Sequence, residues 1–370
     1  MSAFRRLIRR DSDLSFGHTE GTEVPAVGHL VLCRGAAARG NSGPGQHSSP
    51  PRENHMSVIR SALEAAVRAP SPHNSQPWRF EVAGDRIDVL LDGDRVLQAA
   101  DPDGREARLS CGAAILNLRV AIRAAGRTPV VELHTDPARL ATVRAGGPRA
   151  ASPEDHALAR AIAYRRSNRR PFTERTVPPH VREALVRAAV AEGAELTLVR
   201  EPGLTGELAM LLRRAERTQR ADPRFQDELA RWTVTEGARD DGVPLVAGGP
   251  RAEPGTQLAL RRFGGGGGER PYERTPLLAV LSSYTDVPLA QVRTGQALQR
   301  VLLTATTAGV SVSFLSQAVE VPAMRSSLRR LLGRPTHPQA VLRFGYGFSA
   351  PATRRRSVDQ VTHHLAEAPS

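Results

Sequence analysis

The stretch "SCGAAILNLRVAIRAAG", residues 110–126, aligns without gaps with "RTGQALQRVLLTATTAG", residues 293–309. In each copy a small residue and a glycine precede an apolar helical pattern that ends at a glycine. A second pair of similar helices, "RSALEAAVRA" at 60–69 and "REALVRAAVA" at 182–191, opens the two halves. Chance similarity between alanine-rich helices is one explanation. The matching order of elements favours the other, a duplicated α+β unit whose halves pack as a fused pseudo-dimer.

Around these repeats, helical and strand patterns follow one another from Met56 onward. Ser152 is the expected N-cap of a helix over 152–164, with Pro153 at the first helical position. Residues 78–92, "WRFEVAGDRIDVLLD", alternate across a Gly-Asp turn as in a hairpin or two short strands. The other expected helices cover 56–69, 106–126, 179–191, 294–309 and 321–333, with two more between 204 and 236; the other expected strands cover 128–134, 194–199, 277–283, 310–316 and 339–347.

The length of 370 residues accommodates about two domains of roughly 150 residues each. We expect an N-terminal half over 56–150 and a C-terminal half over 151–362. Residues 1–55 are rich in Gly, Ser, Pro and Arg, which is typical of a disordered extension, and 363–370 form a short tail. Residues 237–275 contain a run of five glycines and are expected to form a long flexible loop, of the kind that serves as a lid or a linker.

The composition excludes several classes of protein. No apolar run reaches the length of about 18 residues that a membrane span needs. The net charge of +13 suggests a nucleic-acid binder, but every basic residue is arginine, the arginines are spread along the chain, and only 4% of residues are aromatic. We therefore expect no nucleic-acid and no membrane partner. The two cysteines, Cys33 and Cys111, suggest neither a disulfide framework nor a metal site, which favours a cytoplasmic protein.

The loop "PSPHNSQPW", residues 70–78, is richer in prolines and polar donors than a plain connector requires. In combination, "APSPHNSQPWRF" at 69–80, "RRSNRRPF" at 165–172 and "LRFGYG" with "TRRRSVDQV" at 342–361 resemble three segments of the FMN-dependent nitroreductase family. The resemblance covers roughly residues 56–362. Together with the duplication, the overall pattern is similar to the Acg-type subfamily, which fuses two nitroreductase halves in one chain. It implies an α+β chain with a duplicated nitroreductase-like fold and mixed central sheets flanked by helices.

The family is a homodimer with two FMN sites, each built from segments of both subunits. In this chain the first half keeps the PSxxN loop but has no RRSxR segment, whereas the second half has RRSNRR and TRRRS but no PSxxN loop. Because the losses are complementary, the resemblance implies one complete site, and hence one FMN per chain. NAD(P)H is the implied reductant. Whether the pseudo-dimer assembles further is left open.

Carried over by position, the motifs imply a role for each candidate residue. Arg165, Ser167 and one or more of Arg354–Arg356 would face the phosphate and ribityl chain, and Arg169 would lie near the pyrimidine edge. The rigid PSPHNSQPW loop of the other half would present polar side chains to the flavin. In the C-terminal half, Ser316 and Gln317 would lie near N5 and O4. The full set of expected cofactor-binding residues is Arg165, Arg166, Ser167, Asn168, Arg169, Pro70, Ser71, His73, Asn74, Gln76, Ser316, Gln317, Arg354, Arg355 and Arg356.

Each of these assignments has an ordinary structural alternative. The arginines could form surface ion pairs of little energetic value, and the 316–317 segment could be a buried strand end that caps the next helix. Trp78 is expected in the interface core. Catalysis needs no side-chain nucleophile because the flavin carries the chemistry, and His73 is a weak candidate for a proton donor. One extra residue precedes Phe172 in "RRSNRRPF", so Phe172 departs from the family pattern.

The function implied by the resemblance is hydride transfer from NAD(P)H to FMN and then to a small-molecule acceptor such as a nitroaromatic or a quinone. The alternative is a protein that sequesters or stores FMN, with the 237–275 loop as a lid over the flavin and little or no redox turnover. A loop of this kind covers the flavin in Acg-type proteins, and a covered ring would leave little room for nucleotide and acceptor in turn.

Overall fold

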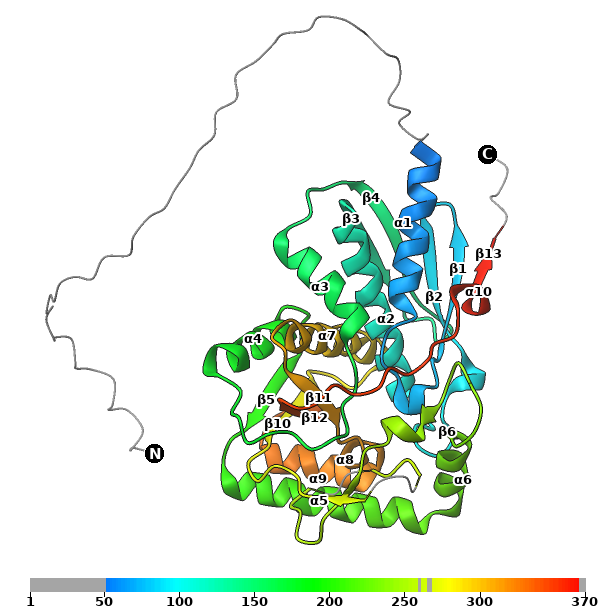
Figure 1. Cartoon of the computed structure of the whole chain (residues 1–370). Coiled ribbons are helices and arrows are strands. Elements are labelled where there is room, and N and C mark those ends of the chain that lie inside the picture. The colour runs from blue at the N-terminus through cyan, green and yellow to red at the C-terminus, as the bar shows by residue number, and fades with distance from the viewer. Residues whose placement is uncertain (1–50, 259–260, 265–267, 366–370) are drawn as a thin grey trace, which may run out of the picture. The chain divides into compact units, whose positions relative to one another are not determined.

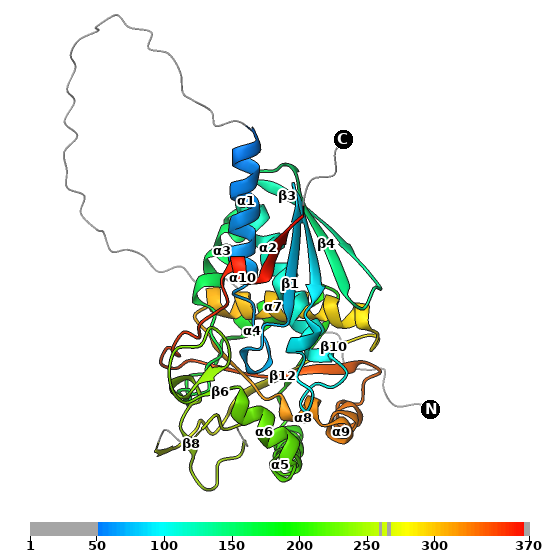
Figure 2. The same cartoon turned by 90° about the vertical axis from the view of Figure 1, so that its right-hand side faces the viewer.

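The two copies of the repeat lie in two long helices, α2 (Arg105–Ala124) and α7 (Pro288–Thr307), which pack against each other where the two halves meet (Figures 1 and 2). The computed structural model describes residues 51–258, 261–264 and 268–365. The corresponding glycines of the repeat, Gly112 and Gly295, lie at the crossing. A Cβ on Gly112 would lie 2.1 Å from the carbonyl oxygen of Val292, and one on Gly295 would lie 2.1 Å from that of Leu109. The paired glycines therefore let the two backbones touch.

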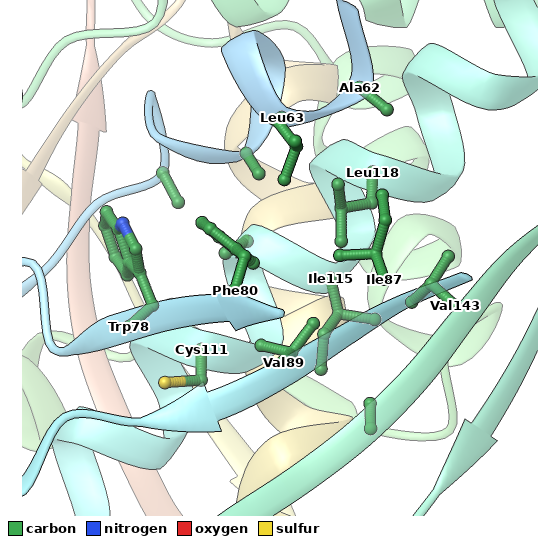
Figure 3. Packing of buried hydrophobic residues seen from close by; sticks show 14 of the residues in the cluster. Ala62, Leu63, Trp78, Phe80, Ile87, Val89, Cys111, Ile115, Leu118 and Val143 are labelled. Carbon is green, nitrogen blue, oxygen red and sulfur yellow. The ribbon is translucent and has the colours of Figure 1, made fainter. Parts of the chain in front are cut away.

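The first sheet has the strand order β13-β1-β2-β4-β3. Strands β1 (Trp78–Ala83) and β2 (Arg86–Leu91) form the predicted hairpin, and β3 (Arg127–Leu133) pairs with β4 (Arg139–Pro148). Figure 3 shows Trp78 and Phe80 of β1 and Ile87 and Val89 of β2 pointing into one apolar core with side chains of α1 and α2. Alternation along the hairpin thus produced the predicted buried face. The sequence did not predict β4.

The second sheet is antiparallel throughout, with the order β11-β12-β10-β5. Its strands are β11 (Ser311–Phe314), β12 (His337–Gly345), β10 (Leu277–Ser283) and β5 (Glu195–Val199). Helices α4 (Pro179–Val190) and α7 cover one face, and α5 (Pro202–Ala221), α8 (Gln317–Glu320) and α9 (Pro322–Leu332) cover the other. Burial on both faces explains why β10, LLAVLSS, begins as a continuous apolar run. β12 is buried from Pro338 to Gly345 although its sequence, HPQAVLRFG, also includes polar residues.

Two segments join the halves. Helix α3 (Pro153–Tyr164) packs on both α2 and α7, and it begins with the expected cap, since Ser152 and Asp155 form a capping box. After β12 the chain returns to the first half, where α10 (Val358–Val361) leads into β13 (Thr362–His364). Strand β13 pairs in parallel with β1, so the C-terminal segment completes the first sheet (Figures 1 and 2).

Several boundaries differ from the sequence prediction. Helix α1 (Pro51–Ala66) begins five residues before Met56; the rest of the predicted disordered extension, residues 1–50, lies outside the described residues. The two helices predicted between residues 204 and 236 are α5 and α6 (Pro223–Arg231). The second of them ends at Arg231, before the predicted limit. The insertion 237–275, which we predicted to be a long flexible loop, contains several short elements. It includes β7 (Val243–Pro244), which pairs with β6 (Thr233–Val234), the turn η3 (Leu245–Ala247), and β8 (Arg251–Ala252), which pairs with β9 (Glu269–Arg270). None of the described helices is long and apolar enough to cross a membrane.

Candidate functional site

A large cavity lies where the two halves, the insertion and the C-terminal segment meet. Its empty volume is about 1190 Å³, which includes space open to solvent. The PSPHNSQPW loop and the start of α2 form one side, and the 165–169 segment, β11, α8 and β12 form the other. Eleven of the fifteen predicted cofactor-binding residues line it: Pro70, Ser71, His73, Asn74, Arg165, Arg166, Ser167, Arg169, Ser316, Gln317 and Arg355.

One end of the cavity carries a cluster of arginines without counter-ions. Arg165 is only 4% exposed, and its Nε and Nη1 atoms find no hydrogen-bond partner among the described residues. Burial, then the neighbouring Arg166, lowers the pKa of Arg165 to about 10. Burial and the nearby Arg165, Arg166 and Arg68 lower the pKa of Arg355 to about 9. Within the described part of the chain no carboxylate pairs with Arg165, Arg166 or Arg355, so an anion bound here would relieve their repulsion.

The PSPHNSQPW loop holds an unusual backbone conformation. His73, Asn74 and Gln76 have positive φ angles of 50°, 58° and 54°, a region that residues other than glycine seldom adopt. The hydroxyl of Ser71 accepts a hydrogen bond from the Gln76 backbone N–H at 2.9 Å and closes the loop. Conformations of this kind persist only where the surroundings hold them.

The amide side chains of this loop provide that support. Asn74 Nδ2 donates to the carbonyls of Gly242 at 3.0 Å and Arg354 at 3.1 Å. Gln76 Nε2 donates to the Asp240 carbonyl at 2.7 Å, and Gln76 Oε1 accepts from the Arg356 N–H at 2.9 Å. Both side chains therefore tie the loop to the insertion and to the C-terminal segment. Asn74 lines the cavity, and its Oδ1 atom is buried without a hydrogen-bond partner among the described residues.

Four predicted residues do not line the cavity. Gln76 is fully buried in the contacts just described. Asn168 donates to Ser311 Oγ and to the Phe348 carbonyl, which fixes the 165–169 segment beside β11. The side chain of Arg354 is largely exposed and lies 3.8 Å from Asp240, and that of Arg356 lies 3.7 Å from Asp92. Of the three tail arginines, only Arg355 lines the cavity.

The other end of the cavity is closed by the insertion. Phe263 packs edge-on against the ring of His73, and Arg261 Nη1 lies 3.2 Å from His73 Nε2. Arg261 also forms an ion pair with Glu320 of α8, with 2.9 Å between Nη1 and Oε1. Burial, followed by the charge of Arg261, lowers the pKa of His73 to about 3. The imidazole is therefore neutral at physiological pH, which argues against His73 as a proton donor.

Arg169 and the 316–317 segment also lie on this side. Arg169 Nη1 donates to the Ala247 carbonyl at 3.1 Å, and its guanidinium stacks 4.5 Å from the Phe263 ring centroid. Burial, then Arg261, lowers the pKa of Arg169 to about 10. The Ser316 carbonyl accepts hydrogen bonds from the N–H groups of Val319 and Glu320, as expected of a residue that begins the helix α8. Ser316 and Gln317 nevertheless line the cavity as well.

A buried ion pair anchors the far end of the insertion beside the 165–172 segment. Arg343 of β12 is 0% exposed and lies 2.7 Å from Glu273, and its guanidinium stacks 4.0 Å from the ring centroid of Phe172. Glu273 also accepts the backbone N–H of Phe172 at 2.9 Å. The hydroxyl of Tyr272 donates to the Arg169 carbonyl at 2.8 Å. Phe172 thus belongs to this anchor and does not line the cavity.

Several residues that line the cavity were not predicted from the sequence: Glu106 and Ser110 of α2, Arg261 and Phe263 of the insertion, and Glu320 of α8. Glu106 read as an ordinary acid in the first turn of a helix, where a carboxylate complements the helix dipole. The motif "RRF" at 261–263 directly precedes the run of five glycines and was the available signal in the insertion.

Comparisons with known proteins agree with this architecture. No family model matches the chain. A protein of Mycobacterium tuberculosis H37Rv named "Putative NAD(P)H nitroreductase acg" is 35% identical over 325 residues, which cover 84% of this chain and 96% of that protein. A second protein of that strain, also named as an NAD(P)H nitroreductase, is 33% identical over 317 residues and covers 82% of this chain and 90% of its own length.

Among solved structures, a protein from Anabaena variabilis described as "a putative nitroreductase" superposes with a TM-score of 0.51 at 10% sequence identity. The match covers 82% of this chain and 90% of that one. At this identity the match bears on the fold alone. It confirms the α+β fold with sheets flanked by helices that the sequence predicted. Of the two predicted mixed sheets only the first is mixed, through the parallel pair of β13 and β1, and the second is antiparallel.

Proposed function

Because this chain belongs to the Acg-type NAD(P)H nitroreductase family, we propose that it binds one FMN in the cavity between its halves and acts as an NAD(P)H-dependent oxidoreductase. The observation that supports this most is the cluster of the buried Arg165 and the partly buried Arg166 and Arg355 at one end of the cavity, for which the described residues provide no carboxylate partner. Guanidinium groups with free N–H donors are suited to a phosphate dianion. The acceptor would be a quinone, a nitroaromatic or a similar small molecule.

The residues that line the cavity fit an FMN whose phosphate lies at the end with Arg165 and Arg355. Arg165 and Arg355 would hold the phosphate, with Ser167 nearby as a hydroxyl donor. Arg169 would face the pyrimidine edge, where a cation favours negative charge on the ring, and Asn74 Oδ1 would accept a hydrogen bond. When bound, FMN takes a hydride from the nicotinamide and passes it on. The protein's part is to orient the ring and exclude water.

The site is expected once per chain. Both the PSPHNSQPW loop and the RRSNRR segment line the same cavity, and each occurs once. Titration of the protein with FMN, followed by desalting and a visible spectrum, should give a yellow protein with one flavin per chain. Colourless protein after desalting would contradict the proposed function, and two flavins per chain would contradict the single site.

Anaerobic mixing with NADH or NADPH tests the oxidoreductase function against FMN storage. The storage alternative is favoured by one observation, that Val243, Arg261 and Phe263 of the insertion line the cavity. Rapid bleaching of the flavin absorbance at physiological nucleotide concentrations supports the oxidoreductase. If bleaching appears only after residues 237–275 are replaced by a short linker, the insertion keeps the nucleotide out and storage is the function.

Arg165→Ala should weaken FMN binding by about 1.5 to 3 kcal/mol, the usual value of a hydrogen bond to a charged group. This corresponds to a dissociation constant about 10- to 150-fold higher, measurable by flavin fluorescence titration. Arg170→Ala is the matched control, because Arg170 lies in the same segment, donates to the Ser349 carbonyl and does not line the cavity. Equal affinities for the two variants would place the phosphate elsewhere.

A further inference from the structure

Glu106 lies on the cavity wall with one carboxylate oxygen held and the other unpartnered. It is in the first turn of α2, which Asp101 caps by accepting the backbone N–H groups of Glu106 at 2.9 Å and Ala107 at 2.8 Å. Arg105 Nη2 donates to Glu106 Oε1 at 2.8 Å. No side chain or backbone group of the described residues donates to Oε2. The carboxyl is therefore fixed in orientation and has one oxygen available to a ligand.

The surroundings of Glu106 favour the protonated form. Burial, followed by the charge of Glu320 on α8, raises the pKa of Glu106 to about 8. Asp101 acts in the same direction, whereas Arg105 on α2 and Arg261 in the insertion oppose it. Both arginines also interact with other groups, which limits how far they stabilise the charged form of Glu106. Arg261 pairs with Glu320, and Arg105 also donates to the carbonyls of Gln339 and Val319.

We propose that Glu106 is a catalytic acid, which protonates the electron acceptor in the cavity through the carboxyl oxygen that no other residue engages. This inference rests on the proposed function, because it assigns a role within the same site. Among the described carboxylates, Glu106 and Glu320 line the cavity. Glu320 is engaged by Arg261 and by Gln219 at 2.6 Å, which leaves Glu106 as the carboxyl that can hold a transferable proton.

The proton balance of the reaction calls for such a group. Two electrons and one hydrogen reach a quinone as a hydride that originates from NAD(P)H, and this leaves an oxyanion on the acceptor. The O–H bond of Glu106 then breaks while a new O–H bond forms on that oxygen, and the product leaves as the hydroquinone. Water returns a proton to the Glu106 carboxylate before the next turnover. A positioned general acid typically contributes 10²- to 10⁴-fold in rate.

The first test isolates the acceptor half-reaction. FMN-loaded protein is reduced with dithionite, mixed with benzoquinone in a stopped-flow instrument, and followed by the return of flavin absorbance. We expect Glu106→Gln, which keeps the size of the side chain and its bond from Arg105, to slow this step at least 100-fold at pH 7. Glu183→Gln, on the exposed face of α4, is the control and should be unchanged. Equal rates for wild type and Glu106→Gln would overturn the proposal.

The pH profile distinguishes acid catalysis from a packing role. In the wild type the reoxidation rate should fall as the pH rises through about 8, because Glu106 then loses its proton. Glu106→Gln has no proton to lose there, so its slow rate should stay flat over the same range. A wild-type profile that is flat from pH 6 to 10 would contradict the proposal.

A third measurement needs no reaction. Infrared difference spectra between pH 6 and 10 should show a protonated carboxyl band that titrates near pH 8 and disappears in Glu106→Gln. Its absence from the wild type would overturn the proposal. The pH dependence of the free energy of unfolding provides an independent test of the raised pKa of Glu106. Because the proton is held more tightly in the folded than in the unfolded chain, the wild type should lose stability relative to Glu106→Gln as the pH rises from about 4.5 to about 8.

These tests separate the two levels of inference. If NADH and NADPH fail to bleach the flavin, the proposed function is wrong, yet dithionite still prepares the reduced protein and the role of Glu106 is still decided. If the nucleotides do bleach the flavin and Glu106→Gln reoxidises normally, the proposed function stands and the acid is another group.

Discussion

Glu273→Ala is expected to lower the free energy of unfolding by about 3 to 5 kcal/mol, because it leaves a buried charge without its partner. Arg343, which Glu273 neutralises, is 0% exposed. The substitution also removes the acceptor of the Phe172 backbone N–H. Arg343 keeps its bond to the Arg170 carbonyl and its aromatic contacts, but these groups carry no full negative charge.

Urea denaturation followed by far-ultraviolet circular dichroism measures this loss, provided that the slope of the transition is unchanged. The matched control is Glu195→Ala, which removes the partner of Arg334, a residue with a side chain 54% exposed. Because water screens that pair, its loss should cost less than about 1 kcal/mol. Similar losses for the two variants would mean that the pair between Glu273 and Arg343 is solvated.

Gly295→Ala should destabilise the protein by about 1 to 2 kcal/mol, because the added methyl would meet the backbone of α2. The new Cβ would lie 2.1 Å from the Leu109 carbonyl oxygen and 2.8 Å from the Leu109 Cα, so no flexible side chain can move aside. Overpacking of this kind costs about 1 to 3 kcal/mol or more. The gain of about 1 kcal/mol in helix propensity offsets only part of it.

The control for this variant should have the opposite sign. Gly206 lies in α5, and a Cβ added there would have no atom within 4 Å, so Gly206→Ala should raise stability by up to about 1 kcal/mol. Leu109 of α2 and Leu298 of α7 both line the cavity, so Gly295→Ala should also weaken FMN binding. A stabilised Gly295→Ala protein would contradict the close crossing of α2 and α7.

Sequence periodicity predicted the long helices, the strands of the hairpin β1–β2 and the repeat, whereas the short helices α8 and α10 were not predicted. Each of these features repeats a local spacing of apolar residues, and the glycines of the repeat were visible as Gly112 and Gly295. The short strand β13 was not predicted, because three residues carry no period and its partner β1 is almost the whole chain away. Strand β4 was missed because its first residues follow a polar turn and its last residues are glycines and a proline.

The candidate site was predicted in outline and missed in detail for a similar reason. Motifs located the arginines and the polar loop, and eleven of those residues do line one cavity. Motifs could not show that the side-chain amides of Asn74 and Gln76 donate hydrogen bonds to the backbone carbonyls of Asp240, Gly242 and Arg354. Nor could they single out Glu106, whose chemistry depends on Glu320 and Arg261, residues brought to it only by the fold.

The pairing of β13 with β1 has a consequence for biosynthesis. Residues 78–83 leave the ribosome about 280 residues before their partners, residues 362–364. Until then the edge of β1 has unpaired N–H and C=O groups that could capture another extended chain. Nascent chains stalled before residue 362 should therefore need chaperone protection that chains containing β13 do not.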